Sequence, residues 1–189
     1  MARKSKKIYK TESGAVVHGV MAEFATPADF YHAAENVRDA GYTRWDSFSP
    51  FPVHGIDEAM GLPTPRLPLV AAVIGFTGAG LGYWMQQWMT AVDYPLVVQG
   101  KSYDAWEPRV PITFELGILF TAFAVLIGMF AFNKLPRHHH PLMKKERFLR
   151  VSDDRFIICV EAVDPRFDPS GTRRMLESLG GTNIEIVEE

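Results

Sequence analysis

Two long apolar runs dominate the pattern of hydrophobic and polar positions. From Leu67 to Val92 there is no charged residue, and from Val110 to Asn133 the only charged residue is Glu115. An α-helix rises about 1.5 Å per residue, so roughly 20 apolar residues cross the ~30 Å hydrocarbon core of a bilayer. Both runs are long enough, and both lie far from the N-terminus, where a signal peptide would stand. The pattern predicts a transmembrane hairpin over residues 66–133, with these two runs as its spans.

Each flank of this hairpin shows the order strand, helix, strand. In residues 15–51 a β-type run precedes a helix that Thr26 can cap, and a second extended run follows Gly41. In residues 155–189 an apolar strand precedes a helix that begins at Asp168, and a final alternating strand follows. Side chains recur at helical spacing in both flanks: Phe30, Ala33, Ala34 and Val37 in the first, and Thr172, Met175, Leu176 and Leu179 in the second.

Two strand–helix–strand halves predict an α+β fold, a ferredoxin-like split βαβ domain in which two helices cover one face of a four-stranded sheet. The transmembrane hairpin is inserted between strands two and three, which this fold places side by side. The expected organisation is a basic tail at 1–14, a first half-domain with a proline-rich linker at 15–65, the hairpin at 66–133 and a second half-domain at 134–189.

Basic residues predict the orientation in the membrane. They crowd the N-terminus and residues 134–150, whereas the loop 93–109 holds only Lys101 and Arg109 against three acidic residues. The positive-inside rule therefore places both termini and the α+β domain in the cytoplasm. The aromatic residues of the loop suit the opposite interface. We expect a multi-pass protein of the cytoplasmic (inner) membrane, in contact with the lipid bilayer.

Ligands for redox cofactors are scarce in this sequence. Cys159 is the only cysteine, so neither a CxxCH haem attachment nor a four-cysteine cluster can form. All six histidines lie outside the two spans and cannot hold haem within the bilayer. We expect no cofactor, no metal and no catalytic residue in this chain. Cys159 itself lies in an apolar strand, which favours a small core residue over a nucleophile.

The run His138–His140 and the basic tail are the remaining polar features. The three histidines could bind a metal ion, but no carboxylate or cysteine stands at ligand spacing, and their place among basic residues favours contact with headgroups or a partner. The tail is too short and isolated to indicate nucleic-acid binding.

Small residues mark one face of the first span. Such residues let two helices approach closely in lipid. The face could dock a partner subunit, an alternative that is favoured because one hairpin cannot occupy every face of its two helices. It could also pack on the second span of the same chain. The residues are Ala71, Gly75, Gly78 and Gly82.

Glu115 is the one ionisable residue within a span, about five residues inside the outer end. An intramembrane carboxylate can serve a proton relay or a polar contact. Its position close to headgroup depth favours an interfacial anchor or an inter-subunit hydrogen bond.

Two stretches resemble a known family. The linker with the first span, LPTPRLPLVAAVIGFTGAGLGYWMQ, and the opening of the second span, PITFELGILFTAFAVL, are similar to the ActD subunit of bacterial alternative complex III, a membrane quinol:electron acceptor oxidoreductase. The resemblance extends over essentially the whole chain except the N-terminal tail and His138–His140. It implies a non-catalytic accessory or assembly subunit in a respiratory or photosynthetic electron-transfer chain.

The resemblance also implies partners and their cofactors. Multi-span membrane subunits would oxidise quinol, and multihaem cytochrome c and iron–sulfur subunits would carry haem c and the iron–sulfur clusters. No catalytic residue carries over to this chain, and Glu115 carries over only as a polar contact. Two alternatives stay open: a membrane-anchored domain that senses a small ligand, and a proton-path subunit that uses Glu115.

Overall fold

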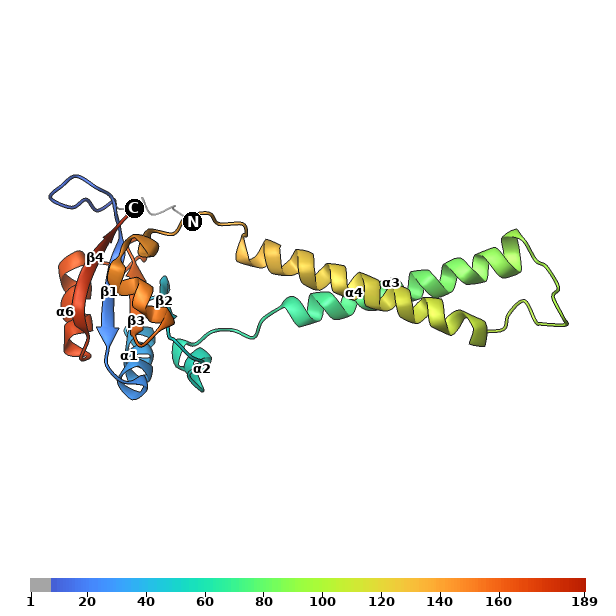
Figure 1. Cartoon of the computed structure of the whole chain (residues 1–189), viewed down its shortest axis with the longest axis horizontal. Coiled ribbons are helices and arrows are strands. Elements are labelled where there is room, and N and C mark those ends of the chain that lie inside the picture. Colours follow the sequence, from blue (N-terminus) through green and yellow to red (C-terminus); the bar gives the residue numbers. More distant parts are fainter. Residues whose placement is uncertain (1–7) are drawn as a thin grey trace. The chain divides into compact units, whose positions relative to one another are not determined.

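The computed structural model describes residues 8–189 of the chain (Figure 1). The chain forms two compact units. One unit holds the chain up to Pro63 and again from His138 onward, and the other holds Thr64–Arg137. Residues 1–7 of the predicted basic tail lie outside the described residues.

The first unit is built on a four-stranded antiparallel sheet with the spatial order β2-β3-β1-β4. β1 lies between two strands from the far side of the hairpin, and Val20 is paired with Val160 on one side and Ile186 on the other. Both halves of the sequence therefore contribute to one sheet, and the predicted α+β class is confirmed. The strands are β1 (Val17–Phe24), β2 (Trp45–Phe48), β3 (Phe156–Glu161) and β4 (Thr182–Glu188).

Two helices, α1 (Pro27–Asp39) and α6 (Pro169–Ser178), pack on one face of this sheet. Both begin as the sequence predicts. The Thr26 hydroxyl accepts a hydrogen bond from the Asp29 N–H at 3.1 Å, and the Asp168 carboxylate accepts one from the Gly171 N–H at 2.7 Å. The helix stripes bury their apolar side chains against the strands, at about 1.5–3 kcal/mol for each fully buried large residue. A short helix, α2 (Ile56–Met60), packs beside α1.

The other face of the sheet is covered by the segment that follows the hairpin. We call residues 141–152 the exit segment. Leu142 and Phe148 of this segment pack against Met21, Ile157 and Val187 of the sheet. This layer was not predicted from the sequence, because its elements are too short to show a period. They are η3 (Pro141–Lys144), α5 (Glu146–Leu149) and η4 (Arg150–Ser152).

Asp164 ties the two halves of the sheet unit together from the β3–α6 connection. Its carboxylate accepts hydrogen bonds from the backbone N–H groups of Thr43 at 2.6 Å and Arg44 at 2.8 Å, just before β2, and from Arg166 at 2.7 Å. Burial alone would raise the pKa of Asp164, but these hydrogen bonds outweigh burial and hold the pKa below its ordinary value.

The second unit is a helical hairpin. α3 (Leu67–Gln87) continues as a π-helical turn, η1 (Trp88–Asp93), and a 3-10 turn, η2 (Glu107–Arg109), leads into α4 (Val110–Asn133). Both helices are long and apolar enough to cross a membrane. Their bounds agree with the two apolar runs because hydropathy and helix length are local properties of the sequence.

The small-residue stripe of α3 is the surface that contacts α4. A Cβ atom added at Gly75 would lie 2.1 Å from the Thr121 hydroxyl oxygen, and one added at Gly78 would lie 2.5 Å from Cγ of Phe120. The four stripe residues, Ala71, Gly75, Gly78 and Gly82, are the buried residues of α3. These contacts are the packing within the chain that the second of the two alternatives describes.

We predict that Gly78→Ala destabilises the hairpin by about 1–3 kcal/mol, because the added methyl group would also lie 2.7 Å from the Leu116 carbonyl oxygen, which cannot move without shifting α4. Gly80→Ala is the matched control, since no heavy atom lies within 4 Å of its added Cβ. Titration of the purified protein with a denaturing detergent would measure both. Equal midpoints for the two variants would contradict this packing.

Candidate functional site

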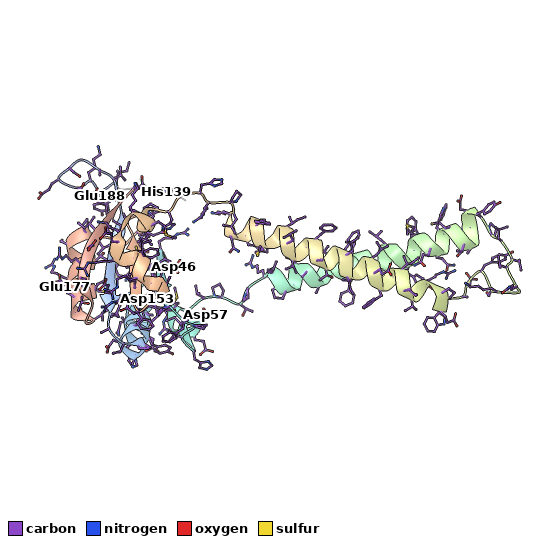
Figure 2. The ribbon with its side chains drawn as sticks, viewed as in Figure 1. Asp46, Asp57, His139, Asp153, Glu177 and Glu188 are labelled. Atoms are coloured by element: carbon purple, nitrogen blue, oxygen red, sulfur yellow. The ribbon has the colours of Figure 1, made fainter. Side chains whose placement is uncertain are left out.

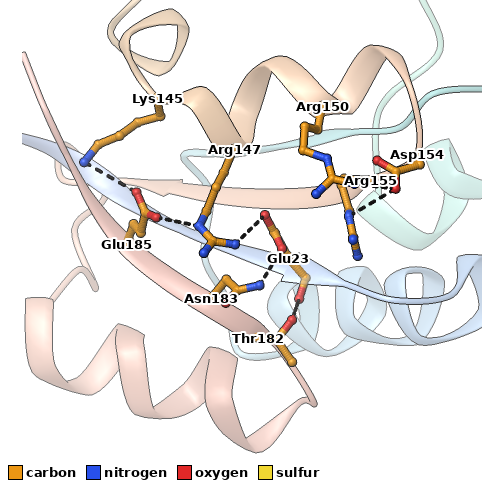
Figure 3. Close-up of polar contacts among 9 residues, drawn as sticks. All are labelled: Glu23, Lys145, Arg147, Arg150, Asp154, Arg155, Thr182, Asn183 and Glu185. Carbon is orange, nitrogen blue, oxygen red and sulfur yellow. Dashed lines mark hydrogen bonds and ion pairs between the residues drawn. The ribbon is translucent and has the colours of Figure 1, made fainter.

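The exit segment is held on the sheet by a set of ion pairs that we call the exit clamp (Figure 3). Arg147 of α5 lies at its centre. Its Nε is 3.0 Å from a Glu185 carboxylate oxygen, and its Nη1 is 3.6 Å from Glu23. Lys145 reaches the other Glu185 oxygen at 3.6 Å, and Asn183 donates a hydrogen bond to Glu23 at 2.7 Å. The clamp thus joins the exit segment to both β1 and β4.

Glu23 is the buried member of the clamp, with a side chain only 4% exposed. A carboxylate taken out of water is costly unless charged or hydrogen-bonding groups replace the water. Arg147 and Asn183 supply those groups, and Asn183 does so from a left-handed backbone position, φ 48°, that asparagine tolerates. No role was predicted for these residues from the sequence, because the partner of an acidic residue in a strand is known only once the strands are paired.

Histidine rings meet at one place beside the exit segment. The rings of His18 and His140 are 5.4 Å apart at a steep angle, while His138 and His139 are exposed. Burial lowers the pKa of His18, and His140 lowers it further, against the opposing charge of Glu161. Within the described residues no three His, Cys, Asp or Glu side chains gather closely enough to hold a metal ion.

Acidic side chains of the sheet unit are spread over several elements rather than gathered. Figure 2 shows Asp57 on α2, Glu177 on α6 and Glu188 at the end of β4, well apart from one another. Cys159 is buried at 2% exposure on the face that the exit segment covers. Burial raises the pKa of this thiol to about 12, so the reactive thiolate is scarce at neutral pH.

Arg109 makes several contacts at the loop end of the hairpin. The residue is 4% exposed, and its guanidinium donates hydrogen bonds to the Thr90 hydroxyl at 3.1 Å and to the Tyr103 carbonyl. It also lies 5.6 Å from the centre of the Tyr83 ring, within the range of a cation–π contact. Gln86 of α3 donates to the Arg109 carbonyl at 3.1 Å. From the sequence, Arg109 was counted only as a charge of the loop, although a lone arginine at the edge of an apolar span is a signal for such a role.

A groove of about 730 Å³ runs between α3 and α4 on one side of the hairpin. Small residues form part of its lining, and larger apolar side chains stand beside them. Among the lining residues are Gly75, Ala79 and Gly117, together with Phe76, Phe114 and Ile118.

Glu115 lies outside the contact between the two helices. It is exposed, and no hydrogen bond or ion pair joins it to another residue in the described part of the chain. Residues two apart on a helix point in nearly opposite directions, about 200° apart, so Glu115 faces away from Gly117, which packs against Ala79 of α3. The structure therefore leaves the one ionisable side chain of the spans without a partner among residues 8–189.

These features define a class of protein in which a small α+β unit is joined to two helices that are long and apolar enough to cross a membrane. A comparison with protein families gives a more specific result. The family model described as "Alternative complex III, ActD subunit" matches residues 18–186. The chain belongs to this family, and it is therefore a subunit of an oxidoreductase complex, as the resemblance of its two spans predicted. A comparison with curated proteins gives no significant match.

We predict that Arg147→Met opens the exit segment and speeds the chemical labelling of Cys159 by about 10-fold to 100-fold. The substitution removes the ion pair of the buried Glu23 carboxylate. Loss of a partner of a buried acceptor costs about 1–3 kcal/mol, and every ~1.4 kcal/mol is a factor of ten in an equilibrium. Cys159 is the only thiol in the sequence, so thiol labelling followed by mass spectrometry measures this opening directly.

Arg150→Met is the matched control for this labelling experiment. Arg150 lies in the same segment, but its pair with Asp154, at 2.7 Å, is exposed on both sides. Exposed pairs contribute at most about 1 kcal/mol, so labelling should rise no more than about fivefold. The same rate in both variants would show that the clamp does not hold the segment on the sheet.

Proposed function

We propose that this chain is a non-catalytic accessory and assembly subunit of alternative complex III. The family match over residues 18–186 carries the proposal, because it extends over nearly the whole chain. The sequence supports the non-catalytic part. One cysteine, and histidines that all lie outside the spans, provide no ligand set for an iron–sulfur cluster, a c-type haem or a haem within the bilayer.

In this proposal the hairpin crosses the cytoplasmic membrane twice, with both termini and the sheet unit in the cytoplasm. The length and hydropathy of α3 and α4 support the crossing. The orientation is supported by the excess of basic residues in the segments that flank the hairpin over those in its loop. Trp88 and Trp106, both exposed at the outer end of the hairpin, suit the opposite interface.

The sheet unit is, we propose, a ferredoxin-like split βαβ domain. Its strand order, with β1 and β3 in the centre and both helices on one face, supports this topology. Such a domain often leaves the second face of its sheet free, but here the exit segment occupies that face. The docking surfaces of this domain are therefore its helices and edge strands, rather than the sheet itself.

The proposed partners are the multi-span membrane subunits that would oxidise quinol and, through the complex, the multihaem cytochrome c and iron–sulfur subunits. The redox cofactors would lie in those partners. Of the two alternatives, the proton path would need Glu115 to be linked to further polar groups. Glu115 has no hydrogen bond within the described residues, so such a path would have to be built largely by other subunits.

We predict that this chain, affinity-purified in mild detergent from its native membrane, brings with it haem-bearing subunits and quinol-oxidising activity. The chain produced alone should show neither a visible haem spectrum nor that activity. The measurements are a reduced-minus-oxidised spectrum and a quinol oxidation assay on both samples. The proposal fails if the native chain purifies without any haem-bearing subunit, or if the isolated chain itself binds haem.

A further inference from the structure

A pocket of about 930 Å³ lies at the loop end of the hairpin, where η1 and the start of α4 meet the loop between the two helices. We call it the loop pocket. η1 is π-helical, a form that is rare in proteins and frequent at functional sites. The wall of the pocket combines apolar side chains with polar and charged ones. Among the lining residues are Met89, Leu96 and Ile112, together with Thr90, Lys101 and Arg109.

Arg109 is the buried charge of the loop pocket, at 4% exposure. Its Nη2 donates hydrogen bonds to the Thr90 hydroxyl at 3.1 Å and to the Tyr103 carbonyl, and both of these residues line the pocket. Its Nη1 is buried and has no hydrogen-bond partner among residues 8–189. The groups that contact the guanidinium, including the Tyr83 ring, are all neutral, and no carboxylate in the described part of the chain pairs with it.

A guanidinium in this position favours an anion for two reasons. A buried charge is costly unless an opposite charge and hydrogen bonds replace the water that it loses. Arg109 also directly precedes the 24-residue helix α4, whose N-terminal end carries a partial positive charge that repels a cation and attracts an anion. A phosphate group supplies both the charge and the paired oxygen atoms that an arginine fork recognises.

We infer that the loop pocket binds the phosphodiester of a phospholipid headgroup, with a phosphate oxygen at Nη1 of Arg109 and the start of an acyl chain against Met89 and Ile112. The inference rests on the proposed function in one respect: the hairpin must cross the membrane, which brings its loop end to headgroup depth. The phosphate would reach Nη1 through a small shift of residues 94–106, a segment that holds no helix or strand.

The charges of the lining favour an anionic lipid. Arg109 and Lys101 against Asp93 leave one net positive charge, which matches the single negative charge of phosphatidylglycerol. Asp93 itself forms no ion pair with Arg109 or Lys101 in the described chain, so it does not neutralise the guanidinium. Free inorganic phosphate has the charge but no apolar part for Met89, Leu96 and Ile112.

Native mass spectrometry of the full chain in a maltoside detergent tests the inference. The two lipids to compare are dioleoylphosphatidylglycerol and dioleoylglycerol, which share their acyl chains and differ in the phosphate. The phospholipid should bind at least about 10-fold more tightly, as expected for a charge-assisted contact with a buried group. An excess of inorganic phosphate should not displace it.

Three results of this comparison would overturn the inference. Equal binding of the two lipids would show an apolar contact alone. Displacement of the lipid by inorganic phosphate would show a site for the free anion. Failure to retain either lipid would point to an anion of another kind, such as an acidic side chain of another protein.

Substitutions in the lining test the role of each charge. Arg109→Gln should weaken binding of phosphatidylglycerol by about 10-fold to 100-fold. Arg66→Gln is the matched control, because Arg66 is an exposed arginine at the start of α3, outside the lining, and its loss should leave binding unchanged. Asp93→Asn should strengthen binding by about 2-fold to 5-fold, because it removes a like charge from the pocket.

Equal affinities in Arg109→Gln and Arg66→Gln would contradict the inference. Circular dichroism would show whether Arg109→Gln still folds, and if it does not, the sign of the change in Asp93→Asn decides. These measurements use the chain alone, so their failure leaves the copurification of haem-bearing subunits untouched. Absence of those subunits from the native preparation would instead contradict the proposed function.

Discussion

The central position of β1 is the constraint on which the rest of the sheet unit depends. β1 comes from the N-terminal side of the hairpin, yet both of its neighbours, β3 and β4, come from the C-terminal side. Neither half can complete a sheet alone, because a strand without neighbours leaves its backbone hydrogen bonds unmade. The long insertion is compatible with this fold because β2 and β3, the strands on either side of it, are themselves paired.

The exit segment gives this arrangement its second layer. A sheet with helices on one face only would expose Met21, Ile157 and Val187 to water, and Leu142 and Phe148 cover them instead. The exit clamp around Glu23 fixes how the exit segment lies on the sheet. Ion pairs and hydrogen bonds select one arrangement, whereas apolar packing alone tolerates several. The chain that leaves the hairpin is therefore part of the sheet unit and not a free linker.

The small residues of α3 form the contact between the two helices of the hairpin. Close approach of α3 and α4 requires Gly75 and Gly78 on one helix opposite Thr121 and Phe120 on the other. Lipid offers no hydrophobic reason for helices to associate, so such close packing is what holds a hairpin together. Glu115 lies outside this contact and is exposed.

The sequence by itself determined every feature that depends on neighbouring residues. The spans, the caps at Thr26 and Asp168, and the strand–helix–strand order of each half follow from hydropathy, spacing and local hydrogen bonding, and the spans also carried the family resemblance. Only the tertiary structure decided which surfaces meet. In the folded chain Glu23 pairs with Arg147, the small residues of α3 are buried against α4, and Glu115 is exposed. Each of these outcomes depends on contacts between segments far apart along the chain, which no local pattern specifies.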